Sequence, residues 1–462
     1  MVKKAWEIDR SLRQAAIPVD RRQVHRNYKE NITIGHLEDN LLSTYWGSEV
    51  PGSGAPDIAY VSMVQAMYNK GFEVSAAERV LHEALPLVKD QDQTALAKKT
   101  QELISTLFES PIDPGHPYHK FEHPARWEDI QKAMHPNASS ARQPVDQSTL
   151  AEKIYQGWIG QLAGGSFGTA LEGYTGDAIT SVYGTITDYV DEPETTNDDV
   201  VYELVFLEVF KRKGRGLTSR DLAEEWVKQI PFGWSAEGVA LENIRNGIWP
   251  PESGSYRNAY SDWLGVQMRT MIEGMLSPGW PMEAARLAVI DGVVSHAANG
   301  VYGGIYAAVL TSLAFIYDDA RALLEAGSYY LPQKSEYARV VQYCLETVSK
   351  SDPVQAWKSM DSHFETYNWI HAYPNIAAVI LALWHSENDM TKAFSLLARA
   401  GMDVDCNGGL VGNILGIMRA VPEKWAKPIS QDDLLETYLP GSPRVSIKSL
   451  ADQTYRAINM ES

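Results

Sequence analysis

The sequence predicts an all-α fold, and three observations support this prediction. Side chains that cap helices recur along the chain, many segments show a helical pattern of apolar residues, and the strict alternation typical of strands is nearly absent. A length of 462 residues with 44% hydrophobic content also indicates that the chain buries a substantial core, in one large domain or in two ordinary ones.

Helix starts are recognised by capping residues, whose side chains accept hydrogen bonds from the first free amide groups of a helix. Two starts resemble capping boxes, and a third places an aspartate before a proline at the first helical position. These starts are Ser75 with Glu78, Thr218 with Asp221, and Asp352 with Pro353. Similar helical patterns are predicted over 151–171, 198–213, 236–247, 261–276, 282–296, 301–325, 335–349, 374–385, 389–400 and 406–419.

The chain divides into three parts. Residues 1–110 are predicted to form a helical N-terminal extension without a chemical cluster, so a cap, a lid and an oligomerisation surface all remain open as its role. Residues 111–148, rich in Pro, His, Ser and Asn, are predicted to be an irregular linker. Residues 149–462 hold the remaining helices and the residue clusters described below, and they are predicted to form the functional domain.

Composition excludes several broad classes of function. The chain has 41 Lys and Arg against 59 Asp and Glu, a formal net charge of −18, which argues against a general nucleic-acid or anionic-membrane surface. Two cysteines, Cys344 and Cys406, are too few for a disulfide framework. No apolar run follows the basic N-terminal pair, and the longest apolar stretch, 376–384, is too short to cross a bilayer. We therefore expect a soluble, cytoplasmic protein without a membrane partner.

Two segments carry glycines four residues apart along one helix face. They are Gly160, Gly164 and Gly168 in GQLAGGSFGTALEG, and Gly408, Gly412 and Gly416 in GMDVDCNGGLVGNILG. Because a glycine inside a helix costs about 1 kcal/mol relative to alanine, three in register favour a smooth face for close approach of another backbone. The two helices are predicted to pack together and to bring Glu172 near Asp403 and Asp405. Close packing without chemistry is the alternative.

Two helices begin with acidic residues. A polar loop delivers Asn197, Asp198 and Asp199 into a strongly apolar helix, and Asp403 and Asp405 begin the second glycine helix. Each start alone is explained by helix capping and by compensation of the helix dipole. Two such starts, far apart in the sequence and each followed by an apolar helix, fit an oxygen-rich site for hard divalent cations better than two independent caps.

Two histidine-centred sets lie among small, turn-forming residues that allow a ligand to approach the backbone closely. SHAANGVYGG contains His296, Asn299 and Tyr302, and WIHAYPN contains His371 and Asn375. Structural roles remain the alternative for these residues, because a lone histidine at a helix end is more often a satisfied structural group than a catalyst.

Other classes of enzyme site find little support in the sequence. It lacks GxGxxG after a strand, GxxxxGK[ST], HExxH, paired CxxC and GxSxG. Cys406 is a weak candidate for a nucleophile, because a helix N-terminus lowers a thiol pKa whereas the flanking Asp403 and Asp405 raise it.

Taken in order, four stretches resemble the motifs of the ADP-ribosylglycohydrolase family, the DraG-like hydrolases. They are GQLAGGSFGTALEG, TNDDV, SHAANGVYGG and GMDVDCNGGLVGNILG, and the intervening WSAEGVALENIRNGIWPP, NAYSDWLGVQMR and WIHAYPN resemble a bacterial branch of that family. The resemblance covers about residues 150–425. It implies an all-α catalytic domain with two divalent cations, Mg²⁺ or Mn²⁺, that cleaves an N- or O-glycosidic bond at the anomeric carbon of ADP-ribose.

The resemblance also assigns residues. It implies metal ligands at Asn197, Asp198, Asp199, Asp403, Asp405 and Cys406. Asn197 and Cys406 stand where the family usually has threonine, so that a soft thiol replaces a hard oxygen at one position. The family commonly has Gly-Asp where this chain has Gly168-Thr169, and an acid follows at Glu172 instead.

The expected mechanism cleaves a ribosyl bond through a transition state with oxocarbenium character. We expect catalytic roles for Glu172, Asp198 and Asp405, and substrate contacts from His296, Asn299, Tyr302, His371 and Asn375. The expected partner is a small ribosyl compound or an ADP-ribosylated target, and the oligomeric state is left open. A metal-dependent phosphohydrolase and a non-catalytic binding protein for ADP-ribose or a nucleotide are the two alternatives.

Overall fold

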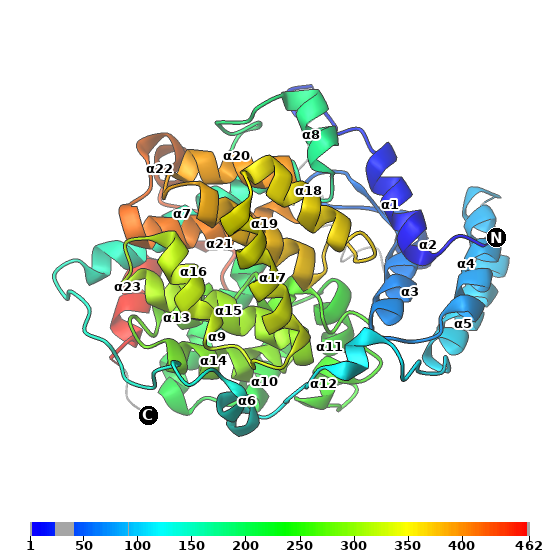
Figure 1. The fold of residues 1–462 in the computed structure, drawn as a ribbon, viewed down its shortest axis with the longest axis horizontal. Coiled ribbons are helices and arrows are strands. Elements are labelled where there is room, and N and C mark those ends of the chain that lie inside the picture. The colour runs from blue at the N-terminus through cyan, green and yellow to red at the C-terminus, as the bar shows by residue number, and fades with distance from the viewer. Residues whose placement is uncertain (1, 24–40, 91, 460–462) are drawn as a thin grey trace.

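The computed structural model describes residues 2–23, 41–90 and 92–459, and helices make up nearly all the regular structure in these ranges (Figure 1). The all-α prediction is confirmed. The strands within the described ranges form two short antiparallel pairs, β1 (Ser48–Glu49) with β2 (Pro56–Asp57) and β3 (Leu435–Glu436) with β4 (Arg444–Val445). Residues 1, 24–40 and 91 of the predicted extension, and 460–462 of the predicted functional domain, lie outside the described ranges.

Most of the predicted helices are present, and α9 has the predicted limits. The helices before residue 150 are α1 (Ala5–Ala15), α2 (Leu41–Gly47), α3 (Ala59–Asn69), α4 (Ser75–Asp90), α5 (Gln93–Phe108), the 3-10 helix η3 (Pro117–Lys120) and α6 (Trp127–Ala133). The helices after it are α7 (Leu150–Gly168), α8 (Gly176–Tyr183), α9 (Asp198–Lys213), η4 (Gly214–Gly216), α10 (Ser219–Gln229), α11 (Ser235–Arg245), α12 (Glu252–Ser255), η5 (Leu264–Val266), α13 (Met271–Met275), α14 (Pro281–Gly292), α15 (Ala298–Ala314), α16 (Ala320–Ser328), α17 (Glu336–Lys350), α18 (Pro353–His363), α19 (Ala372–His385), α20 (Met390–Ala400), α21 (Val404–Arg419), α22 (Glu423–Ser430) and α23 (Ile447–Ala457). The region predicted to be an irregular linker therefore contains η3 and α6.

All three predicted helix starts are confirmed, and two of them have the predicted cap. Thr218 caps α10, and Asp221 completes the reciprocal pair of hydrogen bonds that defines a capping box. Asp352 caps α18, with Pro353 at the first helical position. The sequence predicted these two caps correctly because a cap involves only neighbouring residues.

The helix predicted to start at Ser75 does start there, but the predicted capping box of Ser75 with Glu78 is wrong. Ser75 is the first residue of α4 and not its cap. The Glu78 carboxylate accepts hydrogen bonds from Lys4 Nζ at 3.0 Å and from the Ala5 amide at 3.1 Å. Glu78 thus caps the distant helix α1, because a buried carboxylate takes the free amide groups that tertiary packing offers.

The single helix predicted over 261–276 is also wrong, because only η5 and α13 form there. Side chains take up carbonyls that a continuous helix would use for its own amide ladder. Arg269 Nη1 donates to the Gly265 carbonyl at 2.8 Å, and Thr270 Oγ1 donates to the Val266 carbonyl at 3.0 Å. Buried side-chain contacts override the apolar pattern in this segment.

The helix predicted over 301–325 is two helices, α15 and α16. Asp319 caps α16 by accepting a hydrogen bond from the Arg321 amide at 3.1 Å. The aspartate is a helix start signal that the longer prediction overlooked. The helix predicted over 282–296 likewise ends early, at Gly292.

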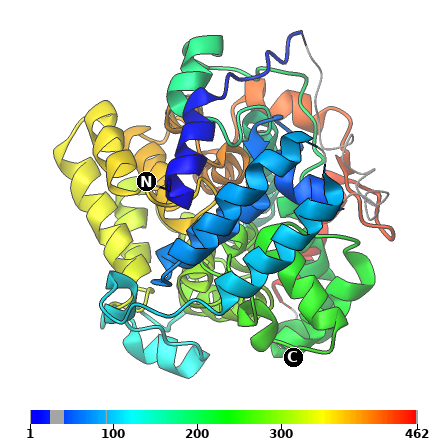
Figure 2. The ribbon, with the colours of Figure 1, turned by 90° about the vertical axis from the view of Figure 1, so that its right-hand side faces the viewer.

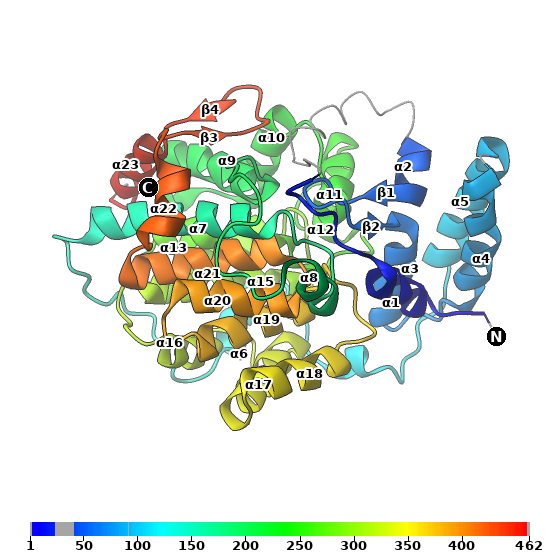
Figure 3. The same cartoon turned by 90° about the horizontal axis from the view of Figure 1, so that it is seen from above.

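The two glycine helices, α7 and α21, lie side by side (Figures 1 and 3). A Cβ atom at Gly164 would overlap the Gly408 carbonyl, and a Cβ atom at Gly168 would overlap the backbone of Asp405. The predicted packing of the two glycine faces is confirmed. This close approach brings the end of α7 to the acidic start of α21.

The remaining helices of the larger part surround this pair. α21 also packs against α15, α19 and α20, and the side chains of α15 are buried along almost its whole length. One apolar cluster extends through these elements. The start of α21 therefore lies inside the molecule, where a charged side chain needs a compensating partner.

Helices α1 to α5 cover one side of the larger part (Figure 2). They form a second apolar cluster that also includes Ala236, Ala259, Tyr260 and Trp263 from beyond the linker. The Tyr260 hydroxyl donates to the Ala59 carbonyl at 3.0 Å across the same contact. The extension and the larger part therefore share a hydrophobic core at their junction.

Two further expectations from the sequence concern disulfide bonds and membrane spans. Cys344 and Cys406 are free thiols, and both are buried. Within the described ranges, no helix combines the length and the hydropathy that a bilayer span requires.

Candidate functional site

The start of α9 presents the first acidic group. Asn197 caps the helix, and its Oδ1 accepts a hydrogen bond from the Asp199 amide at 2.8 Å. The other end of the same amide, Nδ2, donates to Asp405 Oδ2 at 3.2 Å. Asp198 is half-buried and Asp199 is buried. The Asn197 side chain thus joins two helix starts that are far apart in the sequence.

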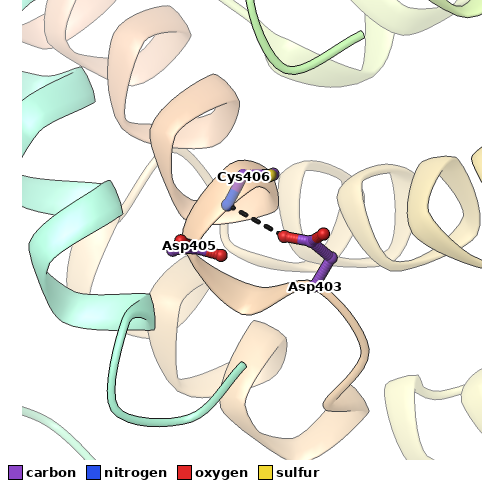
Figure 4. A group of neighbouring side chains, drawn as sticks. All are labelled: Asp403, Asp405 and Cys406. Carbon is purple, nitrogen blue, oxygen red and sulfur yellow. Dashed lines mark hydrogen bonds between the residues drawn. The ribbon is translucent and has the colours of Figure 1, made fainter. Parts of the chain in front are cut away.

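The start of α21 presents the second acidic group (Figure 4). Asp403 caps the helix by accepting a hydrogen bond from the Cys406 amide at 3.3 Å. The Cys406 thiol donates to Asp199 Oδ1 at 3.3 Å. Single ligand atoms from Asp403, Asp405 and Cys406 all lie within 4.8 Å of one another. The acidic cluster, as we call it below, consists of Asn197, Asp198, Asp199, Asp403, Asp405 and Cys406.

Burial and mutual repulsion dominate the electrostatics of this cluster. Burial raises the pKa of Asp199 well above its usual range, and the charges of Asp198, Asp405 and Asp403 raise it further. Burial, followed by the neighbouring Asp405, also raises the pKa of Asp403 well above its usual range. In the described part of the chain, neither Asp199 nor Asp403 forms an ion pair with a basic side chain. A bound cation would relieve this repulsion.

The chemistry of the donors fits a hard divalent cation. Carboxylate and amide oxygens are the ligands that Mg²⁺ and Mn²⁺ prefer, and several of them converge here. Cys406 is the exception, because burial, and then the charge of Asp199, raises the pKa of its thiol well above the usual range. A protonated thiol that donates to Asp199 is neither a good ligand for Mg²⁺ nor an activated nucleophile.

Removal of divalent cations is expected to lower the melting temperature. Buried carboxylates repel one another when no cation holds them, and a cation present at a hundred times its Kd stabilises a folded protein by about 2.7 kcal/mol. We expect a chelator to lower the Tm by a few degrees and Mg²⁺ or Mn²⁺ to restore it, as measured by calorimetry. An unchanged Tm, together with no metal in elemental analysis, would contradict a cation site.

Glu172 follows the end of α7 and is buried. The next residue, Gly173, donates its amide hydrogen to the Met402 carbonyl at 2.9 Å, and the Met402 amide donates to the Tyr174 carbonyl at 3.3 Å. The loop that carries Glu172 therefore lies beside the residue that precedes Asp403. The predicted proximity of these two segments is present in the backbone.

Asn375 also contacts the acidic cluster. Its Oδ1 accepts hydrogen bonds from the Asp403 amide at 3.1 Å and from Asn407 Nδ2 at 2.8 Å. Its Nδ2 donates to the carbonyls of Trp369 and His371, at 2.7 and 2.9 Å. His371 caps α19, and burial lowers the pKa of its imidazole to about 3. The Asn375 side chain thus links the starts of α19 and α21 through hydrogen bonds.

The other three predicted substrate residues, His296, Asn299 and Tyr302, form their hydrogen bonds with residues outside the acidic cluster. The Asn299 backbone N–H donates to Asp262 Oδ1 at 3.1 Å, and the Tyr302 hydroxyl donates to the Pro124 carbonyl of the predicted linker at 2.7 Å. His296 Nδ1 lies 2.7 Å from the hydroxyl of its neighbour Ser295. Among the described residues, no hydrogen bond links these side chains to the acidic cluster, and their assignment to the substrate stays a prediction.

The sequence did not predict the buried Arg269 or its hydrogen-bond partners. Arg269 donates to Glu237 Oε1 at 2.7 Å, to Asp291 Oδ2 at 2.6 Å and to Ser295 Oγ at 2.9 Å. Burial raises the pKa of Glu237 to about 7, whereas the charge of Arg269 lowers it. Burial, and then the same charge, lowers the pKa of His296 well below its usual range. Glu237 and Arg269 stand in WSAEGVALENIRNGIWPP and NAYSDWLGVQMR, two stretches that resemble the family, but nothing in the sequence indicates that they are partners.

Two small hollows lie beside α7, and the first of them adjoins the acidic cluster. Both lie between α7 and the loop that precedes α9, and both are lined by Ser166 and Glu194. Asn197 and Asp199 line the first, and Arg21 of the N-terminal extension lines the second. The loop is fastened to α7, because the Glu194 amide donates to Ser166 Oγ at 3.0 Å.

Comparisons with known proteins place this geometry in context. The sequence model of a family described as ADP-ribosylglycohydrolase matches residues 146–461. A protein of Archaeoglobus fulgidus that carries the description "Uncharacterized protein" is 22% identical over 322 residues, which cover 62% of this chain and 94% of the relative. A solved structure titled "ADP-ribosylglycohydrolase-related protein complex" has a TM-score of 0.49 and 17% identity, and the match covers 67% of this chain and 99% of the other.

Proposed function

The chain belongs to the ADP-ribosylglycohydrolase family, and from this premise we propose that it uses divalent cations to cleave the glycosidic bond at the anomeric carbon of an ADP-ribosyl or related ribosyl substrate. Membership alone supports a glycohydrolase-type hydrolase. The observation that carries the finer proposal is the meeting of two acidic helix starts, joined by the hydrogen bond from Asn197 to Asp405.

The acidic cluster is the proposed cation site. Asp198, Asp199, Asp403 and Asp405 supply carboxylate oxygens, and Asn197 Oδ1, which accepts the Asp199 amide with one lone pair, has a second lone pair to offer a cation. When bound, two Mg²⁺ or Mn²⁺ ions supply positive charge that orients ribose hydroxyls and acidifies water. Two divalent ions balance the formal charge of four carboxylates, which lowers the free-energy cost of burying this group.

The protein side chains have separate proposed roles in catalysis. Asp198 is the member of the cluster that is only half-buried, so its carboxylate is the one best placed to face an incoming substrate. Carboxylates near the anomeric carbon stabilise the positive charge that develops as the glycosidic bond breaks. Glu172 is the proposed proton donor or acceptor, since its loop lies against the start of α21.

A hydrolysis screen tests the proposed function. Purified protein is incubated with ADP-ribosyl and simpler ribosyl compounds, with Mg²⁺, with Mn²⁺ and with a chelator, and products are identified by mass spectrometry. We expect free ADP-ribose or a free ribosyl compound, formed only when a cation is present. Inorganic phosphate as the product would favour the phosphohydrolase, and ligand-induced stabilisation without any product would favour the binding protein.

Replacement of Cys406 by threonine is expected to keep or improve activity with Mg²⁺. A hard hydroxyl oxygen then stands beside the proposed cation in place of a soft sulfur, and the resemblance to the family implies threonine at this position. Cys406→Ala is expected to cost little, as steady-state kinetics will measure. If both variants lost turnover and an alkylating reagent trapped Cys406 in the wild type, the thiol would be a nucleophile and this assignment would be wrong.

A further inference from the structure

A buried arginine of the N-terminal extension reaches the loop that carries Glu172. Arg13, on α1, is only 5% exposed. Its Nη1 donates to the carbonyl of Gly173 at 3.1 Å. Gly173 follows Glu172 directly and donates its own amide hydrogen to the Met402 carbonyl. One chain of contacts therefore runs from the extension through Gly173 and Met402 to Asp403.

A second chain of contacts starts from the same guanidinium. The Arg13 guanidinium lies over the ring of Trp369, 5.2 Å from its centroid. The Trp369 carbonyl accepts a hydrogen bond from Asn375, and Asn375 accepts one from the Asp403 amide. Arg13 thus reaches the cap of α21 by two independent routes.

Two carboxylates of the extension lie close to the Arg13 guanidinium. Asp9 Oδ1 lies 3.5 Å from Arg13 Nε, and Asp57 Oδ1 lies 3.6 Å from Arg13 Nη2. Burial raises the pKa of Asp9 to about 6, although the charge of Arg13 lowers it. Because a buried guanidinium with two carboxylates contributes little net stability, its main effect here is on the relative positions of the groups that it contacts.

We propose that α1 is a working part of the site and that Arg13 is a positioning residue, which holds the loop of Glu172 and the start of α21 in register. The inference rests on the proposed function of the acidic cluster. In this proposal α1 stays in place and supports the cation site through Arg13. Helix α1 therefore does not act as a lid.

The test compares three variants of the full chain by calorimetric titration with Mn²⁺, by kcat and KM, and by Tm. Arg13→Met removes the guanidinium but keeps an apolar stem of similar length. Arg13→Lys keeps the charge for Asp9 and Asp57 but cannot reproduce the planar donor geometry toward Gly173. Arg10→Met is the matched control, because Arg10 also lies on α1 and pairs with Asp361 of the larger part at 2.8 Å, nearer the surface.

We expect Arg13→Met to weaken Mn²⁺ binding about 10- to 100-fold, as loss of an outer-shell support does, and to lower kcat more than it raises KM. Arg13→Lys should be intermediate, and Arg10→Met should match the wild type in affinity and kcat. A folded Arg13→Met with wild-type affinity and kcat would overturn the proposal, even if its Tm were lower.

If Arg13→Met does not fold, Arg13→Lys decides, and wild-type Mn²⁺ affinity and kcat in that variant would overturn the proposal. Failure of the proposed function has a different signature. In that case the wild type itself would bind no Mn²⁺ and form no ribosyl product, and the inference about Arg13 would fall with it.

Discussion

Asp405→Asn is expected to lower turnover by at least about a thousandfold, which corresponds to about 4 kcal/mol of transition-state stabilisation. Asp405 is 1% exposed, and it accepts the hydrogen bond from Asn197 that joins the two helix starts. The substitution keeps the shape of the side chain but replaces a carboxylate oxygen with an NH₂ group, which cannot bind a cation. Asp198→Asn should have a similar effect, and both variants should keep the helical circular dichroism of the wild type.

Asp352→Asn is the matched control for these variants. Asp352 also caps a helix, α18, but it lies outside the acidic cluster, and asparagine caps helices as well as aspartate does. We expect it to retain wild-type turnover. If Asp405→Asn behaved like Asp352→Asn, the acidic helix starts would be caps and nothing more.

Gly164→Ala is expected to lower the free energy of unfolding by about 3 kcal/mol, and the Tm with it. Helix propensity alone predicts the opposite, because alanine is favoured over glycine by about 1 kcal/mol inside a helix. The new Cβ atom, however, would overlap the Gly408 carbonyl, so α7 and α21 must move apart. Overpacking against a side chain usually costs about 1 to 3 kcal/mol, and a rigid backbone leaves less room to adjust. Chemical denaturation followed by circular dichroism measures the change.

Gly409→Ala separates the clash from any general effect of alanine. Gly409 lies on the same helix as Gly408, but a Cβ atom there would be 3.7 Å from the nearest atoms, which belong to Gln161. We expect Gly409→Ala to be as stable as the wild type or slightly more stable. Equal stability of Gly164→Ala and Gly409→Ala would show that the tight approach of α7 to α21 is not needed.

The central helix pair could be predicted because its signal is a repeated local pattern. Glycines at every fourth position serve only close approach, so the spacing of Gly160, Gly164 and Gly168 indicates a contact face without any knowledge of the partner. A second run at Gly408 and Gly412 then supplied the partner. The hydrogen bond from Asn197 to Asp405 joins the start of α21 to the start of α9.

Other features could not be predicted, because they depend on contacts between distant residues. Arg269 gives no sign in the sequence that it is buried, and its partners Glu237 and Asp291 lie 32 and 22 residues away. The break of the helix predicted over 261–276 follows from the same cluster, since Arg269 also donates to the Gly265 carbonyl. A pattern of apolar residues cannot show that a side chain will replace part of the amide ladder.

The contact of the N-terminal extension with the site also depends on residues that are distant in the sequence. Arg13 stands in an ordinary amphipathic helix, and Arg10 on the same helix is indistinguishable from it by local sequence. Only the packing of α1 against the larger part separates a buried contact to Gly173 from a partly exposed pair with Asp361. The sequence therefore left the role of the extension open, and contacts of the folded chain suggest one.

The most direct test of the account is the electron paramagnetic resonance spectrum of the wild type loaded with Mn²⁺, because two ions held at one centre couple magnetically. We expect a coupled signal in the wild type and its loss in Asp199→Asn, because that substitution removes a carboxylate from the α9 side of the cluster. A spectrum of free, uncoupled Mn²⁺ in the wild type, or an unchanged coupled signal in Asp199→Asn, would contradict the proposal that the starts of α9 and α21 form one cation centre.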